Sequence, residues 1–166
     1  MSSNKSSNDR ALGRSESEDP MLQWVTFRLC NETYGINVMQ VKEVLRYTDI
    51  APVPGAPFFV LGIINLRGSV VTVIDTNNCF GLSTSEITDD TRIVIIESEE
   101  QVIGILVESV AEVVYLRQSE IESAPNAGTD ESAKFIQGVS NHNGVLLILV
   151  DLNKLLNEDE RSEFDF

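Results

Sequence analysis

The sequence is poor in basic residues, cysteine and histidine, and each shortage excludes a class of protein. Its 166 residues include 12 Lys and Arg against 26 Asp and Glu, a formal net charge of −14. This charge argues against binding to nucleic acid or to the surface of an anionic membrane, because both depend on Lys and Arg. Cys30 and Cys79 fit no metal-binding or redox spacing. The single histidine, His142, has no neighbouring Cys, His or Ser, so neither a metal site nor a catalytic triad is expected.

Long apolar runs and nucleotide-binding motifs are also missing. No run approaches the roughly 18 residues that cross a bilayer, and the first ten residues contain no apolar segment typical of a secretory signal. A Walker loop and a G-x-G-x-x-G fingerprint are both absent, so no cofactor is expected. Since 42% of the residues are hydrophobic, the chain is expected to be a folded, soluble, cytoplasmic protein.

Polar segments at the two ends mark the expected limits of the folded part. Residues 1–20 contain few apolar side chains and predict a disordered N-terminal tail, and residues 157–166 predict an acidic C-terminal tail. The domain between them, residues 21–156, carries 17 acidic and 8 basic residues, so its own net charge is 8 − 17 = −9. The acidity therefore belongs to the folded surface as well as to the tails.

Short apolar runs rich in Val and Ile predict an all-β fold. Val25, Phe27 and Leu29 alternate with polar neighbours, as in a half-buried strand. Further runs are bounded by Gly, Asn, Ser or Pro; they are Phe58–Ile64, Val70–Ile74, Arg92–Ile96, Val102–Val107, Phe135–Val139 and Val145–Val150. Many short strands with turn residues between them favour a barrel or a sandwich. A short helix is predicted after Asp151, where leucines follow a possible N-cap.

An internal duplication is the most informative feature of the chain. Tyr34–Val44 and Ile103–Val113 align at an offset of 69 with six of eleven residues identical. Gly62–Asn77 and Gly138–Asn153 align at an offset of 76 with five of sixteen identical, where about one match is expected by chance. Two copies, about 22–81 and 91–156, should pack as a pseudo-symmetric pair, since each is too small for a robust core of its own.

The duplication separates structural positions from functional ones. Glycines and asparagines shared by both copies are interpreted as turn residues, and Val38 to Val44 and Val107 to Val113 as containing at least one helical turn. Arg67 lies in the turn Asn65–Gly68, but the second copy has Asn143 there, so the turn itself does not need arginine. Two readings stay open: Arg67 binds a carboxylate or carbonyls of a partner, or it forms an intramolecular salt bridge with Glu43.

The two aspartates that follow apolar strands allow a second class of function. Asp75 and Asp151 are interpreted first as caps or strand-end hydrogen-bonding groups. Two carboxylates sharing a proton could alternatively make the duplicated lobes a hydrolase. Against this, Gly is absent after Thr76, Leu152 stands where a threonine would be needed, and each lobe is short for an enclosed cleft.

Three segments together resemble the CheW family of bacterial chemotaxis coupling proteins. They are YGINVMQVKEV, IAPVPGAPFFVLGIINLRGSVVTVID and ILVESVAEV, and the similarity spans about residues 22–156 in the same order and spacing. The chain departs from the family pattern at Thr72, where proline is common, and at Thr76 to Cys79, where basic residues follow the aspartate.

The resemblance implies both a fold and a function. The fold would be two intertwined five-stranded SH3-like barrels related by pseudo-symmetry. The function would be that of a non-enzymatic adaptor that joins the cytoplasmic tips of chemoreceptors, held in a groove between the barrels, to the regulatory domain of the histidine kinase CheA. Val41, Glu43 and Arg67 match family positions on the receptor-facing surface, with Gly104 nearby, and apolar barrel ends would meet the kinase. A CheW-like adaptor of a signalling system other than motility is a further alternative.

Overall fold

Ten strands and two short 3₁₀ turns make up the described part of the chain. The computed structural model describes residues 18–76, 86–98, 101–123 and 136–151. The first five strands are β1 (Met21–Leu29), β2 (Glu32–Asn37), β3 (Val41–Arg46), β4 (Val60–Leu66) and β5 (Ser69–Asp75). The second five are β6 (Arg92–Ser98), β7 (Gln101–Val107), β8 (Ser109–Arg117), β9 (Ile136–His142) and β10 (Val145–Val150). The 3₁₀ turns are η1 (Val38–Gln40) and η2 (Gln118–Glu120).

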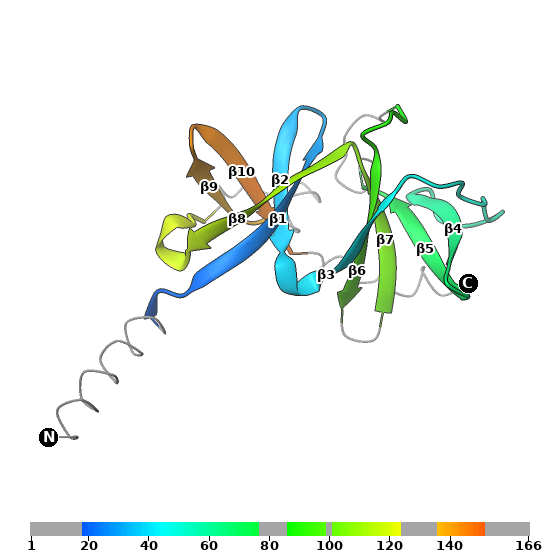
Figure 1. Cartoon of the computed structure of the whole chain (residues 1–166), viewed down its shortest axis with the longest axis horizontal. Coiled ribbons are helices and arrows are strands. Elements are labelled where there is room, and N and C mark those ends of the chain that lie inside the picture. The colour runs from blue at the N-terminus through cyan, green and yellow to red at the C-terminus, as the bar shows by residue number, and fades with distance from the viewer. Residues whose placement is uncertain (1–17, 77–85, 99–100, 124–135, 152–166) are drawn as a thin grey trace, which may run out of the picture.

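The strands form two five-stranded sheets that lie side by side (Figure 1). One sheet has the order β8-β1-β2-β10-β9 and the other has the order β3-β6-β7-β5-β4. When five is added to each strand number of the second order, and ten is subtracted from any result above ten, the order becomes β8-β1-β2-β10-β9, which is the first order. The two sheets are therefore the same arrangement, as the duplication predicts.

Each sheet combines strands from both sequence copies, so the copies are intertwined. The first copy contributes β1 and β2 to one sheet and β3, β4 and β5 to the other. The pairing register of the strands follows the same offset of 69. Val25 pairs with Val113 in one sheet and Val94 pairs with Val44 in the other, and Val94 and Val113 are the residues 69 positions after Val25 and Val44. Parallel pairing of β10 with β2, and of β5 with β7, joins the copies inside each sheet. The prediction of two intertwined five-stranded barrels is confirmed.

A glycine in each sheet allows the barrel to close. Ala51 and Ile63 exchange two backbone hydrogen bonds, with N···O distances of 2.9 and 2.8 Å, which ties the segment after β3 to the edge strand β4. A Cβ atom at Gly62 would overlap the carbonyl oxygen of Ala51. Gly138 has the same role beside Glu122, which bridges to Val139. The interpretation of Gly62 and Gly138 as turn residues is wrong, since both occupy strands where another backbone comes very close.

Three hydrophobic clusters stabilise the pair of barrels. The largest lies between the sheets, with Phe27 and Ile36 from one sheet and Ile74, Val94 and Ile105 from the other. Two smaller clusters fill the barrels, one containing Trp24 and Leu149 and one containing Ile93, Ile95 and Val73. Consecutive residues of β6 therefore face different clusters, which explains its unbroken apolar run. Neither copy could bury these side chains alone, because the shared cluster combines residues of both copies, such as Phe27 and Ile105.

Two predictions of helical structure have different outcomes. A helical turn follows β2 at η1, and Val41 then begins a strand, as expected for the first copy. The corresponding prediction for the second copy is wrong, because β7 ends at Val107 and β8 starts at Ser109 with no helical turn between them. The helix predicted after Asp151 lies outside the described residues. Within the described ranges, no helix is long and apolar enough to cross a membrane.

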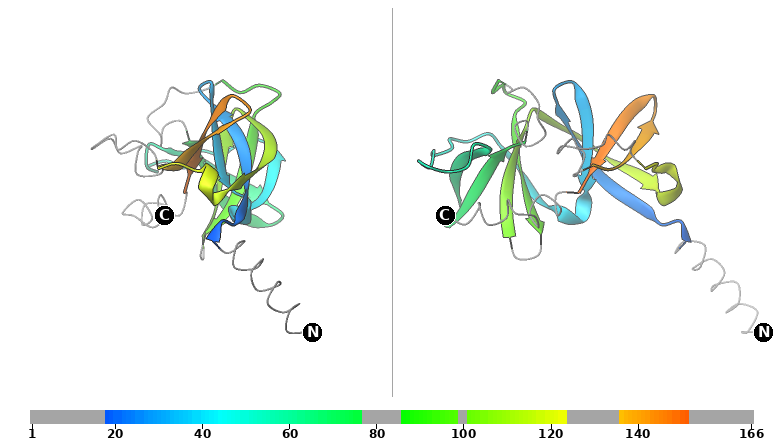
Figure 2. Two further views of the ribbon diagram at one scale, coloured as in Figure 1. Left: turned by 90° about the vertical axis from the view of Figure 1, so that its left-hand side faces the viewer. Right: turned by 180° about the vertical axis from the view of Figure 1, so that it is seen from behind.

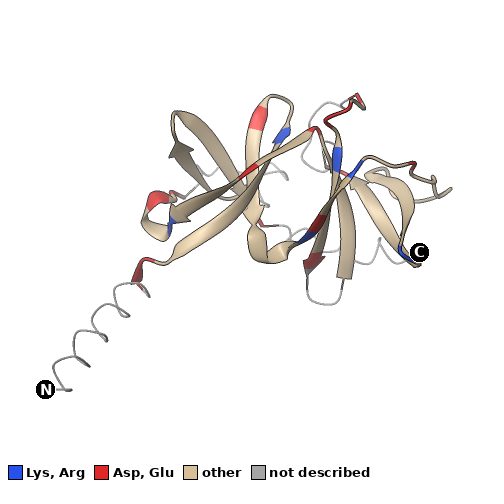
Figure 3. Ribbon diagram, in the orientation of Figure 1, with Lys and Arg blue, Asp and Glu red and all other residues tan. Residues whose placement is uncertain are grey.

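Asp and Glu residues, red on the ribbon of Figure 3, occur in both barrels. The view from behind in Figure 2 shows the two groups of strands side by side, with β1 leading away toward the N-terminus. Residues 18–20 also contact the barrel that contains β1 and β8, since Asp19 accepts hydrogen bonds from the backbone N–H and the hydroxyl of Ser119 in η2. The folded surface is thus anionic, in keeping with its composition.

Candidate functional site

Arg67 occupies the first central position of a tight turn between β4 and β5. Arg67 and Gly68 both have positive φ, 52° and 89°, as in the type I′ turns that match the twist of paired strands. The Oδ1 atom of Asn65 accepts a hydrogen bond of 2.9 Å from the Gly68 N–H. The turn predicted from the sequence is therefore confirmed.

The second copy builds the same turn with a residue better suited to it. Asn143 and Gly144 have φ values of 54° and 82°, and Asn141 accepts a hydrogen bond of 3.1 Å from the Gly144 N–H. Asparagine is enriched at positive φ, whereas a long unbranched side chain has no such advantage. Arginine at position 67 thus stands where the backbone favours asparagine, so its presence needs a reason outside the turn.

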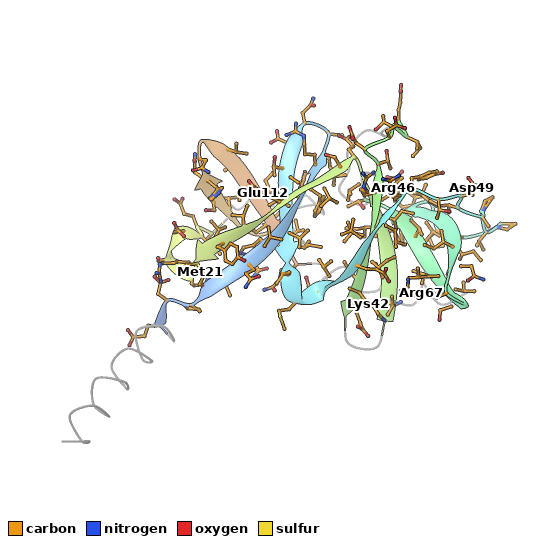
Figure 4. All side chains as sticks on the ribbon, viewed as in Figure 1. Met21, Lys42, Arg46, Asp49, Arg67 and Glu112 are labelled. Atoms are coloured by element: carbon orange, nitrogen blue, oxygen red, sulfur yellow. The ribbon has the colours of Figure 1, made fainter. Side chains whose placement is uncertain are left out.

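Glu43 is presented to Arg67 by an irregularity in β3. The pairing of β3 with β6 shifts between Val41 and Glu43, so Lys42 is an extra residue, a β-bulge, on the β3 side. A bulge of this kind twists the strand and redirects the side chains beside it. Figure 4 shows Lys42 and Arg67 at the same end of their barrel.

Arg67 and Glu43 form an ion pair through both guanidinium nitrogens. Nη1 donates to Oε1 at 3.4 Å and Nη2 donates to Oε2. The side chain of Arg67 is 66% exposed and that of Glu43 27% exposed. Of the two readings of Arg67, the intramolecular salt bridge is therefore present, and the guanidinium nevertheless faces solvent. The pair joins β3 to the β4–β5 turn across the open side of the sheet.

The ion pair changes the acidity of both groups. The hydrogen bond from Arg67 lowers the pKa of Glu43 below its ordinary value of 4.5, and partial desolvation opposes this only in part. The hydrogen bond and the negative charge of Glu43 raise the pKa of Arg67 above its ordinary value. Both groups are accordingly charged at neutral pH, and the surface there is a fixed dipole rather than a titrating site.

Val41 and Gly104 have different surroundings from the charged pair. Val41 is half-buried, pairs with Ile96 and packs against the cluster between the sheets. Gly104 is buried in the middle of β7, where a Cβ atom would stand 2.9 Å from Cγ2 of Ile93. Gly104 pairs with Ile95, which pairs in turn with Glu43, so it lies two strands from Glu43 and beneath the surface.

Exposed valines on β3 and β8 are surface features that the sequence analysis missed. Val44 is 41% exposed and Val113, 69 residues later, is 43% exposed. In Figure 1, β3 crosses in front of β6 and β8 crosses in front of β1, so both strands face the same side. The duplication could have found this pair, because the two valines are identical in the alignment of the copies.

The two aspartates of the hydrolase hypothesis end strands of different sheets. Asp75 closes β5 and is buried, whereas Asp151 follows β10 in the other sheet. Asp75 lines a cavity of about 310 Å³ together with Glu86, Glu108 and apolar side chains, but Asp151 does not line it. Among the described residues, no group of His, Cys, Asp or Glu could hold a metal ion. This arrangement does not support a two-carboxylate site.

Comparison with known proteins assigns the chain to a family. Residues 23–160 match the model of the CheW-like domain. The chain is 36% identical over 146 residues to the chemotaxis protein CheW of Treponema pallidum, covering 86% of each chain. It is 34% identical over 135 residues to CheW of Bacillus subtilis, covering 81% of this chain and 86% of that protein.

A solved structure supports the same assignment. The crystal structure of the scaffolding protein TtCheW from Thermoanaerobacter tengcongensis matches with a TM-score of 0.75 and 33% sequence identity, covering 83% of this chain and 89% of that chain. Fold, duplication and sequence similarity thus agree over nearly all of the described residues, and the chain belongs to the CheW family.

Proposed function

We propose that this chain is a non-enzymatic chemotaxis adaptor that works in the cytoplasm. It joins the tips of chemoreceptors to the regulatory domain of the histidine kinase CheA, and through them it is recruited to membrane-associated arrays. The match to the CheW-like domain over residues 23–160 carries this proposal. The hydrolase alternative has no comparable support, because its two aspartates belong to different sheets.

The receptor-facing surface is proposed to lie on β3 and the adjoining turn. Arg67 offers an exposed guanidinium on a rigid hairpin, and Glu43 fixes its direction. Val44, the next residue on β3, is exposed and apolar and supplies contact area for the apolar face of a helix. The charged pair orients a bound helix more than it strengthens binding, since exposed ion pairs contribute little affinity.

Val41 and Gly104 support this surface from below. Val41 anchors the start of β3 to the cluster between the sheets, which holds Glu43 in place. Gly104 allows the side chains of Ile93 and Ile95 to fill the space over β7. Gly104 therefore acts on the receptor surface through the packing of the sheet and not by direct contact.

The kinase is proposed to bind apolar residues at the ends of the barrels. Val70 on β5 and Leu146 on β10 occupy equivalent positions, 76 residues apart, next to the two hairpin turns. Both are exposed although apolar, at 67% and 49%. Two such patches on one adaptor allow a repeating assembly, in which multivalency strengthens modest contacts.

The experiment is co-sedimentation of the full chain with receptor-containing membranes and CheA. Arg67→Glu is expected to lower the recovered fraction several-fold, because it reverses the exposed charge and repels Glu43. Arg28→Glu is the matched control, since Arg28 is exposed on β1 and the change in net charge is the same. Circular dichroism and urea unfolding check that both variants fold.

Three outcomes separate the proposals. Recovery of Arg67→Glu at the wild-type level contradicts the role of Arg67 but leaves the adaptor function intact. Failure of the wild-type chain to sediment with receptors and kinase contradicts the adaptor function itself. Swimming behaviour of a strain that lacks the chain distinguishes motility from another signalling output.

A further inference from the structure

The two barrels carry equivalent acidic residues, and among the described residues a basic partner stands beside one of the two. The pairing of β8 with β1 shifts between Val110 and Val113, as the pairing of β3 with β6 shifts after Val41. We call the barrel with the order β3-β6-β7-β5-β4 the first barrel and the barrel with the order β8-β1-β2-β10-β9 the second. Glu112 occupies in the second barrel the position that Glu43, 69 residues earlier, occupies in the first. Figure 4 shows Glu112 on β8.

In the second barrel, no described arginine or lysine forms an ion pair with this carboxylate. The turn position equivalent to Arg67 is Asn143, whose Nδ2 lies 3.4 Å from Nε2 of His142. Arg67 thus pairs with the acid of the first barrel, whereas the side chain of Glu112 is exposed. Both copies thus have a glutamate at this position, and among the described residues Glu43 is the one of the two that pairs with an arginine of the same chain.

A buried threonine holds the backbone of Glu112 in place. The Thr26 hydroxyl donates to the Glu112 carbonyl at 2.7 Å and accepts from the Glu112 N–H at 3.1 Å. Thr26 is only 1% exposed, and its equivalent 69 residues later is Ile95, which is fully buried. A hydroxyl in a core position where the other copy has isoleucine is tolerated when it is hydrogen-bonded. Here both of its bonds fix the residue that carries the carboxylate.

We infer that Glu112 is a docking position for a Lys or Arg side chain of the bound receptor helix. The inference rests on the proposed function, and it adds the charge that the partner must carry. In the first barrel the counter-charge comes from the chain's own Arg67. In the second barrel the backbone of Glu112 is held rigidly and its carboxylate is exposed. A basic side chain of the partner can therefore supply the counter-charge and form a charge-assisted hydrogen bond with Glu112.

The test measures binding of a fluorescent receptor-tip fragment to the full chain by anisotropy. Glu112→Gln is expected to weaken binding several-fold and Glu112→Lys at least about tenfold, because the second variant adds repulsion. Glu32→Gln is the matched control, since Glu32 is an exposed acid at the tip of β2 and the change in net charge equals that of Glu112→Gln. Added salt should weaken the wild-type complex more than the Glu112→Gln complex.

A charge reversal in the fragment completes the test. Changing its Lys and Arg residues to Glu one at a time should identify one position that restores binding to Glu112→Lys. If the wild-type chain binds but both Glu112 variants bind equally well, the inference is wrong and the proposed function stands. If the wild-type chain does not bind the fragment, the proposed function fails, and the inference fails with it.

Discussion

Arg67 and Glu43 connect the two edges of one sheet. Glu43 lies on β3 and Arg67 in the turn that leaves β4, and these are the first and last strands in the order β3-β6-β7-β5-β4. Backbone pairing between Ala51 and Ile63 closes the same barrel at another point. The side-chain pair therefore belongs to the barrel as well as to the proposed receptor surface, and experiments on Arg67 must measure both properties.

Arg67→Asn should separate the turn from the surface. Asparagine, which the second copy has at Asn143, suits positive φ, so the folded state should remain as resistant to urea as the wild type or slightly more so. Receptor binding should fall, because the exposed guanidinium is lost. Urea unfolding followed by fluorescence and the co-sedimentation assay measure the two effects. Loss of the fold in this variant would show that the ion pair is needed to close the barrel.

The pH dependence of the Arg67–Glu43 pair follows from the lowered pKa of Glu43. A carboxyl group with a lower pKa in the folded state stabilises the protein above its ordinary pKa of 4.5, and this contribution disappears as the pH falls through the lowered value. NMR titration of the Glu43 side-chain carboxyl carbon should give a pKa below 4.5 in the wild type. In Arg67→Asn the pKa should return toward the ordinary value. An identical pKa in both proteins would contradict the ion pair.

Gly62→Ala should disrupt the closure of the barrel. The added Cβ would overlap the carbonyl oxygen of Ala51, so the bridge to Ile63 must break or shift. We expect a loss of about 3 kcal/mol or more in the free energy of unfolding, measured with urea. Gly68→Ala is the control, because nothing lies within 4 Å of its Cβ and only the φ of 89° is strained. Equal losses in the two variants would argue against the close approach at Gly62.

Gly104→Ala should reduce stability and receptor binding together. Its Cβ would meet Ile93 at 2.9 Å and Ile95 at 3.3 Å, so the core of that barrel becomes overpacked by about 1–3 kcal/mol. Gly35→Ala is the equivalent change in the other barrel and should cost less, because the nearest atom, at 3.0 Å, ends a leucine side chain. Weaker receptor binding without loss of stability would indicate a direct contact at Gly104, contrary to its burial.

Asn143→Arg should transfer the ion pair of the first barrel to the second. The new arginine occupies the turn position of Arg67 and faces Glu112, the carboxylate equivalent to Glu43, so a salt bridge between the two side chains should form. A double-mutant cycle of Asn143→Arg with Glu112→Gln, measured by urea unfolding, detects the coupling between them. A coupling energy of zero would mean that the two turns do not present their side chains alike.

Local patterns identified most strands and both hairpin turns correctly. The alternation of Val25, Phe27 and Leu29 places them on one buried face, and Asn65 caps its turn as expected. The alternation misjudged Thr26, which is buried as well, because β1 is covered on both faces. A single strand cannot indicate that its polar side faces the interior of its own barrel, since that interior is lined by residues far along the chain, such as Leu147 and Leu149.

The site was predictable to the extent that it differs between the copies. Arg67 was identified because Asn143 replaces it, whereas Glu43, which both copies share, was named as a salt-bridge partner of Arg67 and through the family resemblance. Whether Arg67 faces its own Glu43 could not be predicted, because the two residues meet only when β3 and β4 become edges of one closed sheet. Gly104 was assigned to the partner surface by family resemblance, and its burial between Ile93 and Ile95 became evident only in the sheet.

The sequence by itself determined the duplication, the turn chemistry and the acidic balance, because each depends on residue identity and short-range spacing. Tertiary structure decided how the copies share strands and why Gly62 and Gly138 must be glycines. It also decided that Glu43, rather than the equivalent Glu112, pairs with Arg67. These properties depend on backbones and charges that come together from distant parts of the chain, such as Ala51 against Gly62. The two equivalent glutamates differ in surroundings for that reason, although the same residue stands at both positions.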